Sequence, residues 1–321
     1  MQLTGIHHLT AVSGNIRENR RFYTQTLGLR LVKRSVNQDD VKAYHLFYAD
    51  SAGTPGTDIT FFDWKVGPER RGTHSVVQTA FRVGGAGSIA WWQTRFAELG
   101  VKAGHGHERD GRLTLDFEDG EGMRLALIDG GGVHNESVPY AASTVPAEHQ
   151  MHGLGPITMS VPELRHTHEV LTEVMTLRPV REYTRATDAA GSKPHHVHVY
   201  EMGAGGPNAE LHVAVQPELR QAQGGAGGVH HVAFRTPTES EYHEWTRRLT
   251  EFGQRHSGEV DRYWFRSLYF REPNGVLFEI ATDGPGFAVD ESAETLGEQV
   301  VLPPFLEPQR ARILAGLQPL D

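Results

Sequence analysis

Apolar and polar residues alternate along the chain in an order that recurs four times. Each copy has a short strand-like stretch, a longer helical pattern and then further strand-like stretches. A period of two is typical of strands, whereas apolar residues three and four apart are typical of helices. The order therefore predicts four βαβββ modules. Their first strands are residues 5–12, 76–83, 155–161 and 228–236, and their last strands are 58–64, 122–129, 209–216 and 275–283.

The predicted helices span residues 15–28, 88–100 and 240–253, and each ends in a glycine. Glycine commonly ends a helix because it adopts the left-handed conformation without strain. The third module has a helical pattern over 163–177 but lacks this glycine. It is therefore the weakest of the four copies.

A linker composition over residues 130–153, rich in glycine, proline and small polar residues, divides the 321-residue chain near its middle. We therefore predict an α+β fold in which four βαβββ modules pair into two domains, each with a curved mixed sheet enclosing a cup. The predicted domains are 1–140 and 150–290, with two modules each. Residues 291–321 are expected to form a mostly irregular tail with one short helix.

Composition removes several classes of function. The 31 basic and 40 acidic residues give a net charge of -9 without a basic stripe, which argues against nucleic acid as a partner. No stretch approaches 18 apolar residues, and the first residues lack the pattern of a signal peptide, so we expect a cytoplasmic protein without a membrane partner. The chain has no cysteine, so a metal would need histidine and carboxylate ligands.

Two histidine pairs occupy equivalent positions, in the first strands of the first and fourth modules. Successive side chains of a strand point to opposite faces. His8 and His231 lie on the less bulky face, whereas alternation groups His7 and His230 with the larger apolar residues. The second histidine of each pair is thus the candidate metal ligand.

A carboxylate interrupts the last strand of the fourth module. Alternation places Glu279 on the face opposite Phe278 and its branched neighbours, and Tyr269 of the preceding strand can share that face. The positions that correspond to Glu279 in the other modules are about Thr60, Ala126 and Val213. Only one module therefore supplies the carboxylate, which predicts one metal site per chain.

Simpler interpretations exist for these residues. A histidine pair at the start of a strand is usually hydrogen-bonded or solvent-facing, and Arg262 or Arg266 could neutralise Glu279 without a metal. The histidines at 105, 107, 166, 168, 195, 196 and 198 are expected to be solvated or structural. His45 is assigned to strand pairing, with a role beside the site as the alternative.

Two imidazoles and one carboxylate form the facial triad of non-heme Fe(II) oxygenases, which leaves adjacent positions open for substrate and dioxygen. The repeated positions of the histidines and the single carboxylate favour this interpretation. The triad is His8, His231 and Glu279.

The segments GIHHLTA, FYTQTLGLRLVKRSVN, YHLFYAD, GVHHVAF and PNGVLFEIATD occur in an order that resembles the vicinal oxygen chelate superfamily. Within it, nearly the whole chain is similar to two-domain ring-cleaving dioxygenases of the hydroquinone type. The resemblance implies Fe(II) at the triad, with Mn(II) as the alternative. It also implies a small aromatic substrate, O2 and a homo-oligomer. The residues it implies around the metal or the substrate are His7, Thr10, His230, Arg262 and Tyr269.

The expected function is therefore Fe(II)-dependent cleavage of a hydroquinone- or catechol-like ring. One alternative is a metal-dependent isomerase or lyase of the glyoxalase kind, which usually needs a second carboxylate where this chain has Thr60. The other is a protein that binds an aromatic compound, or confers resistance to it, without turnover. The triad argues against that alternative.

Overall fold

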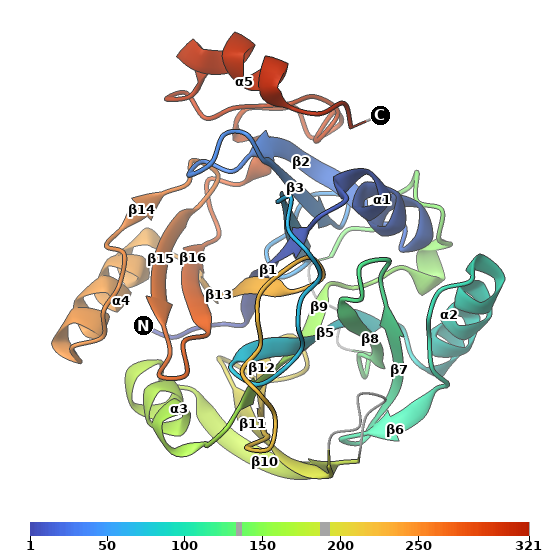
Figure 1. Cartoon of the computed structure of the whole chain (residues 1–321), viewed down its shortest axis with the longest axis vertical. Coiled ribbons are helices and arrows are strands. Elements are labelled where there is room, and N and C mark those ends of the chain that lie inside the picture. The colour runs from blue at the N-terminus through green and yellow to red at the C-terminus, as the bar shows by residue number, and fades with distance from the viewer. Residues whose placement is uncertain (133–136, 187–192, 321) are drawn as a thin grey trace.

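The computed structural model describes residues 1–132, 137–186 and 193–320, and within these ranges the four βαβββ modules are present (Figure 1). Residues 133–136 of the predicted linker lie outside the described ranges. The strands are β1 (Ile6–Ser13), β2 (Arg30–Val36), β3 (Tyr44–Ala49), β4 (Asp58–Asp63), β5 (Ser75–Val83), β6 (His107–Arg109), β7 (Arg112–Glu118), β8 (Arg124–Asp129), β9 (Leu154–Val161), β10 (Arg178–Arg185), β11 (His195–Glu201), β12 (Glu210–Val215), β13 (Val229–Thr236), β14 (Val260–Asp261), β15 (Arg266–Arg271) and β16 (Leu277–Thr282).

Each module has one helix, and capping residues define several of the helix ends. The side chain of Thr238 accepts a hydrogen bond from the Glu241 amide at the start of α4, and Gly100 ends α2 with a φ of 66°. The first and third module helices continue into π-helical turns over Phe22–Thr26 and Val170–Val174. The α-helices are α1 (Ile16–Arg21), α2 (Ala86–Leu99), α3 (Arg165–Glu169), α4 (Glu239–Glu251) and α5 (Arg310–Gly316).

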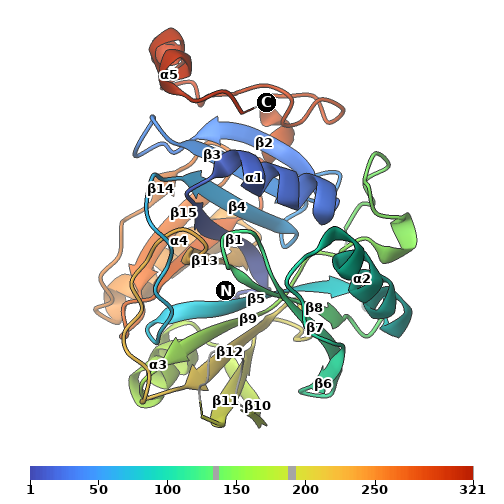
Figure 2. The same ribbon diagram turned by 45° about the vertical axis from the view of Figure 1, so that its right-hand side comes forward.

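The strands form two curved eight-stranded sheets, ordered β14-β15-β16-β13-β1-β4-β3-β2 and β10-β11-β12-β9-β5-β8-β7-β6 (Figure 2). The predicted α+β class with paired modules and curved mixed sheets is confirmed. The partners differ from those expected, because the first sheet joins modules one and four and the second joins modules two and three. Antiparallel contacts of β1 with β13 and of β5 with β9 cause this exchange. Each half of the chain therefore contributes to both cups.

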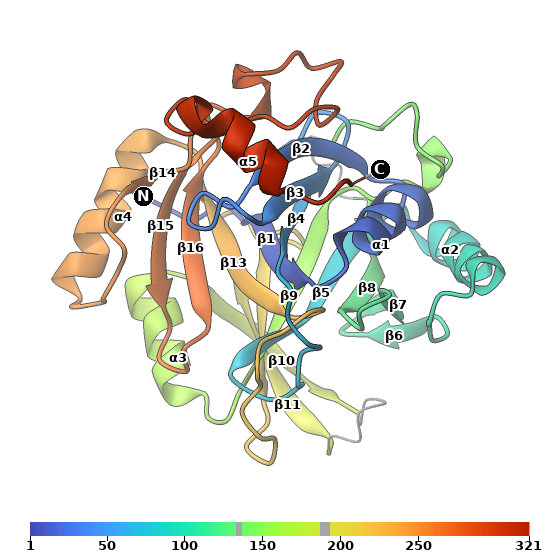
Figure 3. The same ribbon diagram turned by 45° about the horizontal axis from the view of Figure 1, so that its top comes forward.

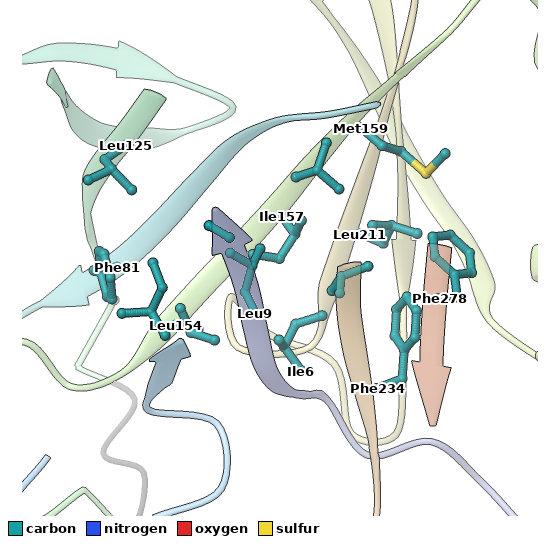
Figure 4. Close-up of a cluster of buried hydrophobic side chains, with 14 of the residues drawn as sticks. Ile6, Leu9, Phe81, Leu125, Leu154, Ile157, Met159, Leu211, Phe234 and Phe278 are labelled. Atoms are coloured by element: carbon teal, nitrogen blue, oxygen red, sulfur yellow. The ribbon is translucent and has the colours of Figure 1, made fainter. Parts of the chain in front are cut away.

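A shared core lies where the two sheets face one another. Leu9 of β1 and Ile157 of β9 are fully buried there, and Phe234 of β13 packs in the same cluster (Figure 4). Burying such a side chain contributes about 1.5–3 kcal/mol. Because strand side chains alternate, placing Leu9 in this core turns Thr10 toward the concave face of the first sheet. The pattern of β1 thus positions the site.

The C-terminal segment packs against the outer part of the first sheet, with α5 beside β2 (Figure 3). The buried Nζ of Lys33 donates to the carbonyl of Phe287 at 2.9 Å and to Asp290 at 2.7 Å, and it also pairs with Glu291. These contacts hold the start of the tail on β2. Among the described residues, no helix is both long and apolar enough to span a membrane.

Candidate metal centre

The three predicted ligands meet on neighbouring strands at the centre of the first sheet. His8 comes from β1, His231 from β13 and Glu279 from β16, and all three are buried. One oxygen of Glu279, Oε2, lies 3.3 Å from His8 Nε2 and 2.9 Å from His231 Nε2. Residues 271 positions apart in the sequence therefore form one cluster (279 − 8 = 271).

Two β-bulges shape the histidine pairs. The register between β1 and β13 shifts at His7 and again at His230, so each of these residues is the extra one on its strand. Their rings consequently lie beside the second histidine, with 2.9 Å between the Nδ1 atoms of His7 and His8 and 2.7 Å in the other pair. The prediction that His7 lies on the same face as Leu9 is wrong, because the bulge at His7 interrupts the alternation of side chains.

The hydrogen bonds of His7 fix which nitrogen of His8 is free. A carbonyl can only accept, so the 3.0 Å contact with the Thr282 carbonyl places a proton on His7 Nε2. Burial, with the neighbouring His8, lowers the pKa of His7 to about 3, so the ring is neutral. Its Nδ1 therefore accepts from His8 Nδ1. Although burial opposes its charge, Glu279 raises the pKa of His8 in the absence of a metal. A metal would replace the proton on His8 Nε2 and bind the lone pair of the neutral ring.

The cluster fits a divalent metal. Ligand atoms that bind one metal at 2.0–2.2 Å lie about 3 Å from one another. The three donor atoms here all lie within 4.8 Å of one another. Among the described residues, neither buried oxygen of Glu279 has a hydrogen bond of good geometry. Although burial opposes its charge, His8 and His231 hold the pKa of Glu279 well below its usual range. A metal would satisfy this carboxylate.

A pocket opens beside the triad between aromatic walls that include Phe62 and Phe265. Tyr269 lies 5.7 Å from the His231 ring, between centroids, and its hydroxyl accepts from Arg262 Nε at 3.3 Å. Burial raises the pKa of Tyr269 above its usual value, so the hydroxyl keeps its proton. Arg262 also donates to Asp39 at 2.9 Å, which holds it at the mouth of the pocket.

Three further polar residues lie on the same concave face. Thr60 Oγ1 donates to Thr10 Oγ1 at 2.8 Å and lies 2.8 Å from His45 Nε2. His45 lines the pocket, so its assignment to strand pairing alone is wrong. Asp58 is buried beside β1, and burial raises its pKa to about 7. Alternation along β4 puts it on the face of Thr60, a signal that could have revealed it.

The second cup has a polar cluster of different character. The register of β9 with β12 pairs Thr158 with His212, so His212, rather than Val213, corresponds to Glu279. His212 lies 2.9 Å from Glu210, whose carboxylate accepts two 2.7 Å hydrogen bonds from Arg112. Arg181 adds a contact to Glu210 at 2.9 Å. The oxygens of this carboxylate therefore already accept from guanidinium groups. A single metal site per chain remains the prediction.

We expect Glu210→Gln to destabilise the protein by about 3 kcal/mol, because it removes the fully buried charge that Arg112, Arg181 and His212 contact. The variant Glu182→Gln on the exposed side of β10 is the control, with a change of about 0.5 kcal/mol or less. Urea denaturation at pH 7 measures both. Arg112 and His212 lower the pKa of Glu210 against the cost of burial, so its stabilisation is present above pH 4.5 and lost on acidification below it. A stability difference between the wild-type protein and Glu210→Gln that grows on acidification would contradict this role of Glu210.

Comparisons with known proteins agree with the fold described above. The model of the Glyoxalase/Bleomycin resistance protein/Dioxygenase superfamily matches residues 5–127 and 153–280. The chain is 41% identical to the protein named "Putative ring-cleaving dioxygenase MhqA" of Bacillus subtilis, with 100% of both chains covered. It is 28% identical to the "Chlorohydroquinone/hydroquinone 1,2-dioxygenase" of Sphingobium indicum, over 98% of this chain and 95% of that one.

A solved structure described as a "putative dioxygenase" from Bacillus subtilis superposes with a TM-score of 0.87 at 34% identity. It covers 100% of this chain and 98% of that chain. The chain therefore belongs to the glyoxalase, bleomycin resistance and dioxygenase superfamily. The resemblance seen in the sequence is confirmed, whereas the roles of individual site residues stay predictions.

Proposed function

We propose that this protein is an Fe(II)-dependent dioxygenase that cleaves a hydroquinone-like aromatic ring at the cluster of His8, His231 and Glu279. The enzyme class rests on relatives of the same length that are named ring-cleaving dioxygenases, so the predicted class is confirmed. The metal, the substrate and the residue roles are the proposed part. Mn(II) is the alternative metal, and cytoplasmic location and self-association remain predictions.

One observation carries the proposal of a metal. Glu279 is a carboxylate at 0% exposure, and its Oε2 lies 3.3 Å and 2.9 Å from two imidazole nitrogens whose other ring nitrogens are already engaged. Two histidines and one carboxylate on one side of an ion favour Fe(II) and leave adjacent positions for other ligands. When bound, iron would supply sites for a substrate oxygen and O2 and would transfer electrons between them.

Arg262 and Tyr269 supply charge and a proton to the reacting oxygens. Arg262 Nε–H donates to the tyrosine oxygen, so the tyrosine proton remains available for donation into the pocket. The guanidinium charge at the same point favours an ionised substrate hydroxyl or an oxygen anion formed during the reaction. Tyr269 is thus proposed as the general acid and Arg262 as the group that stabilises the anion.

The remaining predicted residues act on geometry. His7 and His230 orient the two ligand imidazoles through the short Nδ1 contacts, as outer hydrogen-bonding partners do in metal sites. Thr10 holds Thr60 in place. Phe62 and the other aromatic walls exclude water from the ring that binds between them. This set of residues binds the substrate and protects a reactive anion from solvent.

The glyoxalase-type alternative is less well supported. Thr60, which corresponds to Glu279 in the first module, faces the cup but is bonded to Thr10. A hydroxyl in this arrangement is a poor substitute for a second carboxylate ligand. The geometry therefore favours oxygen chemistry with open coordination positions over an isomerase.

Oxygen consumption tests the proposed function. The protein loaded with Fe(II) without oxygen should consume O2 when mixed with hydroquinone, chlorohydroquinone or catechol, with a preference among these rings. The same preparation loaded with Zn(II), which has no redox chemistry, should consume none. Metal binding without oxygen uptake on any ring would instead favour the isomerase or lyase.

A further inference from the structure

His45 lies in the pocket but has no role in the chemistry described so far. Its strand, β3, is separated from β1 by β4, so His45 and the metal ligand His8 stand at different places on one concave face. Phe47 and Phe62 flank the imidazole, with ring centroids 3.9 Å and 4.4 Å away. These rings fix the orientation of His45 more tightly than solvation of a surface histidine would.

The hydrogen bond at Nε2 of His45 determines whether Nδ1 is a donor or an acceptor. The hydroxyl of Thr60 donates its single proton to Thr10, so at His45 it can only accept. The proton of the neutral imidazole is therefore on Nε2, and Nδ1 carries a lone pair. Burial, with the nearby His8, His231 and Arg262, lowers the pKa of His45 well below its usual value. The ring is thus a neutral acceptor.

Nδ1 of His45 faces accessible space. Within the described ranges, no hydrogen bond to this atom is present, and it does not belong to the buried polar atoms that lack partners. Since His45 lines the pocket, the acceptor is available to a molecule that binds there. A neutral acceptor between aromatic walls matches a hydroxyl on an aromatic ring, which is a good donor with an apolar body.

We propose that His45 is a substrate-binding residue that accepts, at Nδ1, a hydrogen bond from a ring hydroxyl other than the one bound at the metal. This inference rests on the proposed function, and it adds a requirement that the triad does not impose. The preferred substrate must carry two hydroxyl groups, because one binds the metal and the other donates to His45. A ring with a single hydroxyl leaves the His45 acceptor unpaired, which costs affinity.

The test compares the binding of hydroquinone and phenol to the Fe(II)-loaded protein by calorimetry without oxygen. We expect the wild-type protein to bind hydroquinone about tenfold more tightly than phenol. In His45→Phe, which keeps the ring between Phe47 and Phe62, this ratio should fall to about one. Phenol affinity should change little, whereas a purely structural role would weaken both ligands equally.

Two further variants separate the nitrogens of the imidazole. The amide of His45→Asn lies near the Nδ1 position and should retain part of the preference, whereas that of His45→Gln lies near Nε2 and should lose it. An unchanged ratio in His45→Phe and His45→Gln, or a wild-type ratio near one, overturns the inference. The binding ratio needs no turnover, so it is measured separately from oxygen uptake, whose absence would overturn the proposed function instead.

Discussion

Replacing Glu279 by glutamine should weaken Fe(II) binding by more than about 100-fold and reduce oxygen uptake to the level of the metal-free protein. The carboxylate is the only acid within the cluster of His8 and His231 described here, and an amide oxygen neither carries the charge nor replaces the second oxygen. Equilibrium dialysis against a competing chelator measures the metal affinity, and an oxygen electrode measures the activity.

Glu210→Gln is the matched control for this variant. Both carboxylates are fully buried, and each lies in one of the two cups. The control should lose stability but keep its iron, whereas Glu279→Gln should lose iron at a temperature where both remain folded. Undiminished iron binding by Glu279→Gln would exclude this cluster as the metal site.

Removing the hydroxyl of Tyr269 should slow ring cleavage by about 10²–10⁴-fold without loss of metal. Phenylalanine keeps the ring against His231 and takes away the hydroxyl whose oxygen accepts from Arg262. Single-turnover mixing of the iron-loaded variant and substrate with O2 measures the chemical step apart from binding.

Tyr263→Phe serves as the control. Tyr263 lies shortly before β15, the strand of Tyr269, but it does not line the pocket in the described structure. Its rate should equal that of the wild-type protein. If Tyr269→Phe turned over at the wild-type rate, another group would have to supply the proton.

The triad could be predicted from the sequence because it depends on local rules. Repeated modules identified equivalent positions, and alternation along the last strand put Glu279 and Tyr269 on one face, where the structure pairs them directly. Glycine and alternation likewise predicted the helix ends and strands. These features need only the conformational preferences of neighbouring residues.

The remaining features depend on contacts between distant strands. The bulges that turn His7 and His230 toward the ligands arise from the register of β1 with β13, which alternation within one strand does not define. The exchange of modules between sheets has the same origin. His45 was underestimated because its neighbours in the cup, Thr60 and Phe62, belong to the adjacent strand.

The proposed reaction at His8, His231 and Glu279 inserts both atoms of O2 into an aromatic ring and opens it. Mass spectrometry of the product formed from hydroquinone under ¹⁸O2 by the iron-loaded protein tests it most directly. We expect an acyclic product that carries both labelled oxygen atoms. Recovery of a benzoquinone or any other unlabelled product would contradict it, because the ring would have been oxidised without insertion of oxygen.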